Sequence, residues 1–248
     1  MAIKAVIFDL DGTLVSFNLD FTSVRVEVRS LLIRAGVPAS ILSINESIFD
    51  MLQKTEIFFK NSGKSERTVS KIRNEALNIA EKHELEAAKT TGLLPGAPGT
   101  LQDLKKMKLK LGLCTISSEK STNYILKRFE IGKFFDAIVP RNKVKNVKPN
   151  TEHLETVLKN LKVKASEAMV VGDSGRDMKC ARDAGTLAVG LPTGVATQER
   201  LVNSGANYFV TTLTDLPNLI ETINRKRSLR TGKEEQPPKT SAIQDWTE

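Results

Sequence analysis

The chain has 248 residues, of which 40% are apolar and 27% are charged, close to the average of soluble globular proteins. This length allows one large domain or two small ones, and no apolar run approaches the roughly 20 residues that a membrane-spanning helix needs. The formal charge of +8 suits an anionic ligand, but the aromatic content of 5% and the lack of a cluster of basic and aromatic residues disfavour nucleic acid.

Secretion and a disulfide framework are also disfavoured. The segment from Met1 to Leu10 has no basic region followed by an apolar stretch and a cleavage site, so it is not expected to be a secretory signal. Two cysteines, Cys114 and Cys180, cannot form a disulfide framework and are expected to be small apolar residues near the sheet. We therefore expect a reducing, cytoplasmic setting.

The chain opens with a β-branched run from Ala2 to Phe8, which predicts a buried strand. The run ends at Asp9-Leu10-Asp11-Gly12-Thr13, where the glycine permits a sharp turn. From residue 16 to 92, apolar residues recur at helical spacing in three stretches separated by breaks. The stretches are Val24 to Ala35, Ile44 to Phe58 and Val69 to Ala80. They predict an all-helical domain inserted at 16–92.

From residue 93 to 223, short apolar runs alternate with helical stretches. Strands are predicted at 110–114, 137–139, 168–171, 186–189 and 208–210. The alternation indicates a parallel sheet with helices on both faces, so we expect a Rossmann-like α/β core formed by residues 1–15 and 93–223. Residues 224–248 hold a basic run and two adjacent prolines with almost no periodicity, which predicts a loosely ordered basic tail.

Polar residues follow several predicted strands, at the points where ligands bind in open α/β sheets. They are Asp9 and Asp11 after the first strand, Thr115 after the second, Lys148 in the segment after the third, and Asp173 and Asp177 after the fourth. Several carboxylates cannot stay ionised together without a cation, and Mg²⁺ prefers a few carboxylates together with a substrate phosphate. Thr115, Lys148 and backbone amides could neutralise the phosphoryl oxygens. The set therefore predicts Mg²⁺-dependent phosphoryl chemistry, with one carboxylate as nucleophile and another as acid and base.

The same residues carry a resemblance to a known family. Asp9-Leu10-Asp11-Gly12-Thr13-Leu14 resembles the first motif of the haloacid dehalogenase superfamily. Thr115 resembles its second motif, Lys148-Pro149 its third, and the segment from Gly172 to Asp177 its fourth, in the family's order. Leu94-Pro95-Gly96 and Phe134-Phe135-Asp136 resemble connecting segments of the phosphoglycolate phosphatase-like branch. The resemblance covers residues 2 to about 220, and within 16–92 it is one of position and helicity only.

The resemblance implies roles for the first-motif residues. Asp9 would be the nucleophile and a Mg²⁺ ligand, and it would form an aspartyl-phosphate that water hydrolyses. Asp11 would protonate the leaving oxygen, later deprotonate that water, and bind the metal through its backbone carbonyl. Family members that dehalogenate or cleave phosphonates lack an acid at this position, so Asp11 favours phosphate ester chemistry. The insert between the first and second motifs resembles a cap of the first type, which closes over the site and selects the leaving group.

It also implies roles for the later motifs. Asp173 would ligate the metal directly, and Asp177 would hold metal-bound water or orient its loop. Thr115, the backbone amide of Ile116 and Lys148 would bind the transferring phosphoryl group. Ile116 departs from the Asn or Ser that often follows the second-motif threonine, and Ser117 could supply a polar side chain in its place. This departure leaves substrate preference more open than reaction type.

Several of these residues have a simpler structural explanation. Asp177 could serve only to cap the following helix. His83 and His153 lie on predicted helices, and we expect both at the surface. The series Arg25, Arg29 and Arg34 presents its cations either to a substrate or to solvent.

The sequence thus predicts a Mg²⁺-dependent phosphatase that acts on a small phosphorylated metabolite, a phosphoglycolate-like or sugar phosphate monoester. A phosphomutase of the same superfamily remains an alternative, since no motif tells whether water or a second hydroxyl receives the phosphoryl group. A signal-receiver domain is disfavoured by the length and the insert. A non-catalytic protein that binds a phosphorylated ligand is disfavoured by the complete set of motif residues. The leaving group and the oligomeric state stay open.

Overall fold

The computed structural model describes residues 2–194 and 196–230. In this part of the chain, six strands form one parallel sheet in the order β3-β2-β1-β4-β5-β6. The strands are β1 (Ala5–Phe8), β2 (Lys110–Thr115), β3 (Ala137–Pro140), β4 (Ala168–Gly172), β5 (Leu187–Gly190) and β6 (Tyr208–Phe209). The prediction of a parallel α/β core is confirmed. Its strand order is that of a doubly wound sheet, which reverses between β1 and β4.

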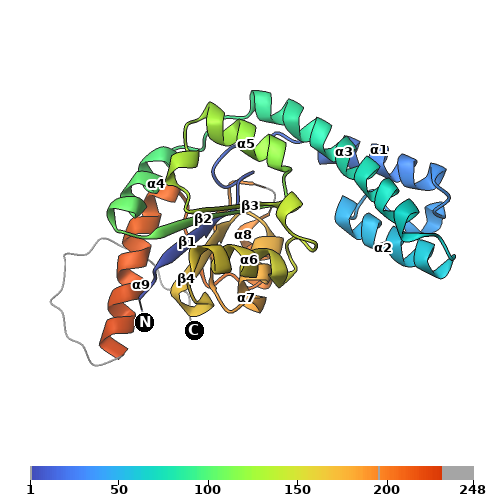
Figure 1. Ribbon diagram of the computed structural model, residues 1–248. Coiled ribbons are helices and arrows are strands. Elements are labelled where there is room, and N and C mark those ends of the chain that lie inside the picture. Colours follow the sequence, from blue (N-terminus) through green and yellow to red (C-terminus); the bar gives the residue numbers. More distant parts are fainter. Residues whose placement is uncertain (1, 195, 231–248) are drawn as a thin grey trace.

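Alternate residues of each strand face opposite sides of the sheet, and both sides are buried. Val6 and Phe8 of β1 pack in a hydrophobic cluster with α4 (Ala97–Lys106), α5 (Glu119–Arg128) and α9 (Leu216–Arg230). Ala5 and Ile7 pack in a second cluster with α6 (Thr151–Leu161), α7 (Gly175–Asp183) and α8 (Gln198–Asn203). Figure 1 shows the sheet between these two helical layers. Burial of Phe8 and Ile7 contributes about 1.5–3 kcal/mol each.

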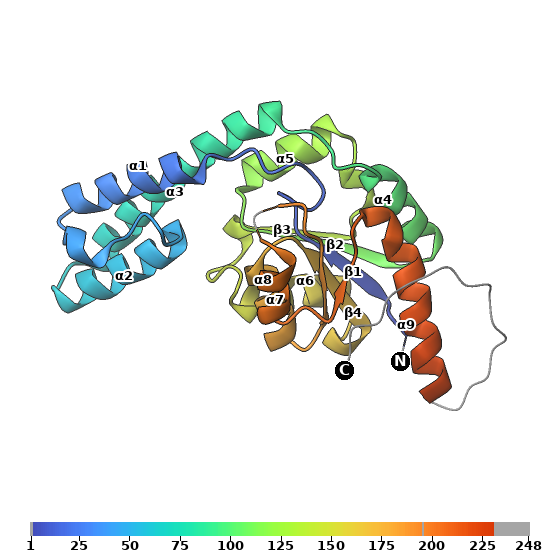
Figure 2. The ribbon, with the colours of Figure 1, turned by 180° about the vertical axis from the view of Figure 1, so that it is seen from behind.

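The residues between β1 and α4 form three α-helices, α1 (Phe21–Arg34), α2 (Ile48–Asn61) and α3 (Glu66–Thr90), with one 3-10 turn (Ala39–Ile41) between α1 and α2. Their apolar faces meet in a third hydrophobic cluster that includes Val28, Met51 and Ala80. Ala88, near the end of α3, belongs instead to the cluster beneath α5. Figures 1 and 2 show the three helices to one side of the sheet, with α3 reaching back to α5. The prediction of an all-helical insert is confirmed.

Side-chain caps fix where the insert helices begin. The Asp20 carboxylate caps α1, Ser47 and Asp50 form a reciprocal capping box at the start of α2, and Ser65 caps α3. Ile44, placed by its spacing on the second helical stripe, precedes the α2 cap and is 43% exposed in the loop before it. The cap therefore overrides the apolar periodicity at this end.

Two linker segments join the insert to the core side by side. Val15 and Leu93 form an antiparallel bridge, and the N–H of Ser16 donates to the Gly92 carbonyl at 2.8 Å. The Thr91 hydroxyl donates to the Ser16 carbonyl at 2.7 Å. The chain therefore leaves and rejoins the core at one place, a few residues after β1.

The expectation that the chain is loosely ordered from residue 224 is wrong for 224–230, because α9 continues to Arg230. Ile220 and Ile223 bury this helix against the sheet, and the Asn224 side chain accepts the N–H of Ile3 at 2.7 Å. Arg227 donates to the Ser166 carbonyl at 3.0 Å. The rest of the expected tail, 231–248, lies outside the described residues. No described helix is long and apolar enough to cross a membrane.

Candidate active site

The carboxyl ends of β1, β2 and β4 lie next to one another, and a candidate site residue stands at each. Phe8, the last residue of β1, pairs with Val171 of β4. Asp9 continues from β1, and its N–H donates to the Val171 carbonyl at 3.0 Å. Thr115 is the last residue of β2, and Asp173 comes directly after β4. The topology brings these three side chains to one edge of the sheet.

Three carboxylates gather at this edge. Asp9, Asp173 and Asp177 offer oxygen atoms that all lie within 4.8 Å of one another, and all three residues are buried. The ammonium group of Lys148, also buried, lies 2.9 Å from Asp9 Oδ1 and 2.6 Å from Asp177 Oδ1. Three carboxylates this close repel one another when ionised, and Lys148 contacts two of them, Asp9 and Asp177. A divalent cation would offset that repulsion.

Burial and neighbouring charges set the protonation of this group. Burial raises the pKa of Asp9 well above its ordinary value, and Asp177 and Asp173 add to the rise, while Lys148 opposes it. Burial by itself would lower the pKa of Lys148, but Asp177 and Asp9 hold that pKa well above its ordinary value. The lysine is therefore a fixed positive charge between two carboxylates.

Gly12 lets the turn after β1 pass close to Asp173. Its φ of +83° lies in the left-handed region, and a Cβ at this position would lie 2.5 Å from Asp173 Oδ2. The Thr13 hydroxyl donates to Asp173 Oδ1 at 3.4 Å, and Gly194 approaches the same carboxylate so closely that a Cβ there would overlap it. The Asp-Gly-Thr run thus has a local reason: only glycine leaves room for the Asp173 carboxylate beside this turn.

The carboxylate of Asp11 has a different partner. The Ser117 hydroxyl donates to Asp11 Oδ2 at 2.5 Å. Burial raises the pKa of Asp11 to about 6, although the hydrogen bond from Ser117 lowers it. A carboxyl group with a pKa near neutrality can both give and take a proton, which is what an acid and base requires.

Asp177 caps α7, as its position in the sequence suggested, and it also binds Lys148. It forms a reciprocal capping box with Ser174 at the start of α7, and its Oδ2 accepts the Ser174 hydroxyl at 2.5 Å. Its Oδ1 accepts the Lys148 ammonium. Both carboxylate oxygens therefore bind groups of the protein itself, which suits an indirect contact to a metal better than a direct one.

Hydrogen bonds fix the conformation of the loop that follows β2. Thr115 is fully buried, and its Oγ1 accepts the N–H of Ser117 at 3.1 Å. The carbonyl of Ile116 accepts a hydrogen bond from Arg141 at 3.2 Å. The hydroxyl of Ser117, which the sequence offered as a polar group in place of the Ile116 side chain, donates to Asp11.

The expectation that His153 lies at the surface is wrong. It is fully buried on α6, where its Nδ1 accepts the N–H of Lys148 at 3.3 Å and its Nε2 donates to the Val139 carbonyl at 2.9 Å. Burial lowers the pKa of His153 to about 4, so the ring is neutral at pH 7. The spacing of apolar residues could have predicted this burial, because His153 lies four residues before Val157 and eight before Leu161 on the apolar face of α6.

Two further candidates, Glu84 and Arg141, were not identified from the sequence. They form a buried ion pair behind the loop that follows β2. Glu84 lies four residues after Ala80 and four before Ala88, on the buried stripe of α3, and this spacing could have marked it. Arg141 directly follows β3, as the other candidates follow their strands.

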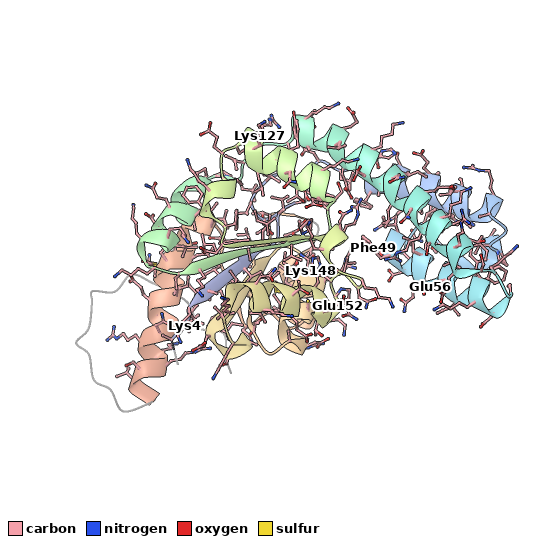
Figure 3. The ribbon with its side chains drawn as sticks, in the orientation of Figure 1. Lys4, Phe49, Glu56, Lys127, Lys148 and Glu152 are labelled. Carbon is pink, nitrogen blue, oxygen red and sulfur yellow. The ribbon has the colours of Figure 1, made fainter. Side chains whose placement is uncertain are left out.

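The insert faces this edge of the sheet. Figure 3 shows Phe49 of α2 on the side towards the core, opposite Lys148. Arg25 of α1 stacks on the Phe21 ring at 4.5 Å, and Arg29 donates to the Leu42 carbonyl at 3.0 Å. These two cations therefore contact neighbouring parts of the insert.

Comparison with known proteins gives consistent similarities. The sequence pattern of the haloacid dehalogenase-like hydrolases matches residues 6–191. Pyrophosphatase PpaX from Bacillus anthracis is 27% identical over 227 residues, which cover 91% of this chain and 100% of that protein. A hydrolase from Pseudomonas syringae has a similar structure, with a TM-score of 0.61 at 23% identity over 89% of this chain and 99% of that one. A structure described as a predicted phosphoglycolate phosphatase, from Haemophilus somnus, has a TM-score of 0.60 at 21% identity over 88% and 97%.

Proposed function

The chain belongs to the haloacid dehalogenase-like hydrolases, and on that premise we propose that it is a Mg²⁺-dependent phosphatase acting on a small phosphate monoester. One observation carries the proposal: the carboxylates of Asp9, Asp173 and Asp177 are buried within 4.8 Å of one another beyond the carboxyl ends of β1 and β4, and Lys148 contacts Asp9 and Asp177. Carboxylates this close repel one another, and a metal ion with a phosphoryl group held beside Lys148 would offset that repulsion. Residues 1–15 and 93–223, together with the rest of α9, would form the catalytic core, and 16–92 its cap.

Asp9 is the proposed nucleophile. One Asp9 oxygen attacks phosphorus, the bond from phosphorus to the leaving oxygen breaks, and an aspartyl-phosphate forms. Lys148, 2.9 Å from Asp9 Oδ1, holds the carboxylate in place and offsets its charge. Water then attacks phosphorus, the bond to Asp9 breaks, and inorganic phosphate leaves.

Asp11 is the proposed acid and base. In its neutral form it gives a proton to the leaving oxygen in the first step. In its ionised form it then takes a proton from the attacking water, which restores the starting state. Its pKa of about 6 makes both forms accessible near neutral pH, and Ser117 holds the carboxylate at one oxygen.

The donor set fits Mg²⁺. Asp9 and Asp173 are the proposed direct ligands together with the backbone carbonyl of Asp11, and Asp177 is proposed to hold metal-bound water. Mg²⁺ prefers oxygen ligands and is usually bound by one or two carboxylates while it keeps several water molecules. When bound, it would supply positive charge that keeps the carboxylates ionised and offsets the phosphoryl oxygens.

Three groups are proposed to bind the phosphoryl group: the Thr115 hydroxyl, the Ile116 backbone amide and the Lys148 ammonium. Thr115 and Ile116 lie at and just after the carboxyl end of β2, and Lys148 lies in the segment between β3 and α6. Phe49, opposite Lys148, is proposed to contact the leaving group. The relatives' names suggest pyrophosphate and phosphoglycolate as first substrates to try, beside the sugar phosphates.

The test is release of inorganic phosphate from pyrophosphate, phosphoglycolate and hexose phosphates, with Mg²⁺ and with chelator. Asp9→Asn should lower kcat by several orders of magnitude, roughly the loss seen when one member of a catalytic unit is removed. Asp103→Asn is the matched control, because Asp103 is an exposed residue of α4 paired only with Lys106 among the described residues. It should leave kcat unchanged.

Other outcomes separate the alternatives. Conversion of one hexose phosphate isomer into another without release of phosphate would identify a phosphomutase. Binding of a phosphorylated compound with no turnover would identify a non-catalytic binding protein. Activity that survives Asp9→Asn would overturn the assignment of the nucleophile.

A further inference from the structure

A buried ion pair joins the insert to the core close to the proposed site. Glu84 comes from the half of α3 that lies against α5, and Arg141 follows β3. Both side chains are less than one tenth exposed. Neither belongs to the set proposed above to touch substrate or metal.

Glu84 uses both oxygens of its carboxylate. Oε1 accepts a hydrogen bond from the guanidinium group of Arg141, and Oε2 accepts the N–H of Ser118 at 2.9 Å. Ser118 is the N-cap of α5 and the last residue of the loop that follows β2. A side chain of the insert helix α3 therefore binds the backbone of this loop directly.

Arg141 holds the same loop from the other side. Its Nη1 donates to the Ile116 carbonyl at 3.2 Å, and its backbone N–H donates to the Ser117 carbonyl, also at 3.2 Å. Its Nη2 donates to the Leu77 carbonyl of α3 at 3.2 Å. Together the pair binds three consecutive residues of the loop, 116–118, and Arg141 binds α3 at two positions, Leu77 and Glu84.

This loop positions Asp11, the proposed acid and base, through Ser117. Ser117 donates its hydroxyl to Asp11, and the N–H of Ser117 donates to Thr115. A shift of the backbone at 116–118 would therefore move the partner of Asp11 and the amide proposed to bind phosphate. Buried ion pairs seldom raise stability above that of an apolar pair of the same size, so stability alone is a weak reason for this one.

We propose that Glu84 and Arg141 are positioning residues that clamp the loop 116–118, so that the insert helix α3 holds Ser117 and, through it, Asp11 in place for catalysis. This rests on the proposed function. The clamp also ties the position of the insert to the geometry of the acid and base, because one of its two members belongs to the insert.

Glu84→Gln tests the clamp directly, with Glu81→Gln as its matched control. Glu81 lies one turn earlier on α3 and also binds the core, through Lys120 of α5 at 2.7 Å, but its bond does not reach the loop. We expect Glu84→Gln to lower kcat about 10- to 100-fold with KM changed less than threefold, since a small misplacement of catalytic groups costs about that much. Glu81→Gln should stay within twofold of wild type.

A double variant separates positioning from folding. Glu84→Leu with Arg141→Met removes both charges and leaves none unpaired, so it should fold with a Tm close to that of wild type. The proposal requires kcat to stay as low as in Glu84→Gln. Recovery of wild-type kcat in the folded double variant would show that the pair serves stability only, and would overturn the proposal.

Hydrogen–deuterium exchange gives a readout that needs no turnover. The peptide covering 113–122 contains the Ser118 amide, which Glu84 accepts in the wild type. Its exchange should be faster in Glu84→Gln and unchanged in Glu81→Gln. Equal exchange in wild type and Glu84→Gln would overturn the clamp, even in an enzyme that is active. Faster exchange together with no phosphate release by the wild type would instead overturn the proposed function and the catalytic part of this proposal with it.

Discussion

At the residue scale, Lys148 is fixed through both its side chain and its backbone. Its ammonium group binds Asp9 and Asp177, and its backbone N–H donates to the His153 ring. His153 in turn donates to the Val139 carbonyl of β3. The neutral ring accepts at one nitrogen and donates at the other, so protonation would break its bond to Lys148.

His153 gives the stability a pH dependence with a definite sign. Its pKa falls from 6.5 to about 4 on folding, so the unfolded chain binds more protons and stability is lost as the pH falls from 6.5 towards 4. At pH 4.5 the loss is on the order of 2 kcal/mol. In urea unfolding, wild type should lose about that much more between pH 7 and pH 4.5 than His153→Gln does.

His83→Gln is the control for this measurement. His83 is a partly exposed residue of α3 that contacts Glu27. Its variant controls for the replacement of a histidine by glutamine at a site away from Lys148. A wild-type curve parallel to that of His153→Gln would show that the buried ring does not cause the loss.

At the scale of elements, two helices connect distant parts of the chain. α3 begins in the hydrophobic cluster of the insert and ends in that of the core. α9 covers the sheet beside α4, and Asn224 within it binds the N–H of Ile3. Because each helix has contacts at both ends, its position is set by packing rather than by its own propensity.

The packing of α9 predicts a large effect from one substitution. Ile220 is fully buried in the core cluster, so Ile220→Ala should lower the free energy of unfolding by about 2–5 kcal/mol. Leu229→Ala, on the same helix at a residue 56% exposed, should change it by less than about 0.5 kcal/mol. Urea unfolding measures both, and equal effects would mean that α9 does not pack against the sheet as described.

At the scale of the whole molecule, the proposed site depends on segments far apart in the sequence. Asp9 follows β1 and Asp173 follows β4, and these two strands are neighbours in the sheet. In the absence of a cation the three carboxylates repel one another, so folding brings together charges that the unfolded chain keeps apart.

Mg²⁺ should therefore stabilise the folded protein. At about 100 times its Kd, it should add about 2.7 kcal/mol and raise Tm by roughly 5–10 °C relative to chelator. Asp173→Asn should lose most of this rise, because a proposed direct ligand of the metal is gone. Thermal unfolding with Mg²⁺ and with chelator measures the rise in Tm. An equal rise in wild type and Asp173→Asn would place the metal elsewhere.

Much of the core could be predicted from the sequence because local patterns decide it. Alternating apolar runs and helical stretches determined the parallel sheet, and the residues at strand ends determined which side chains share an edge. Gly12 marked the turn beside Asp9, since a positive φ and a close carboxylate both require it. The helical insert followed from its three stripes at helical spacing.

Only the tertiary structure decided the rest, because burial depends on what packs against a residue. His153, Glu84 and Arg141 are polar, and their spacing does not reveal the partners that offset the cost of burying them. The start of α2 is set by the Ser47 cap rather than by the apolar stripe. Beyond residue 224, α9 is held by Asn224, which binds the segment before β1, and by Arg227, which binds the turn before β4. Sequence patterns thus determined the strands, the insert and the motif residues, whereas long-range contacts decided how those residues are held.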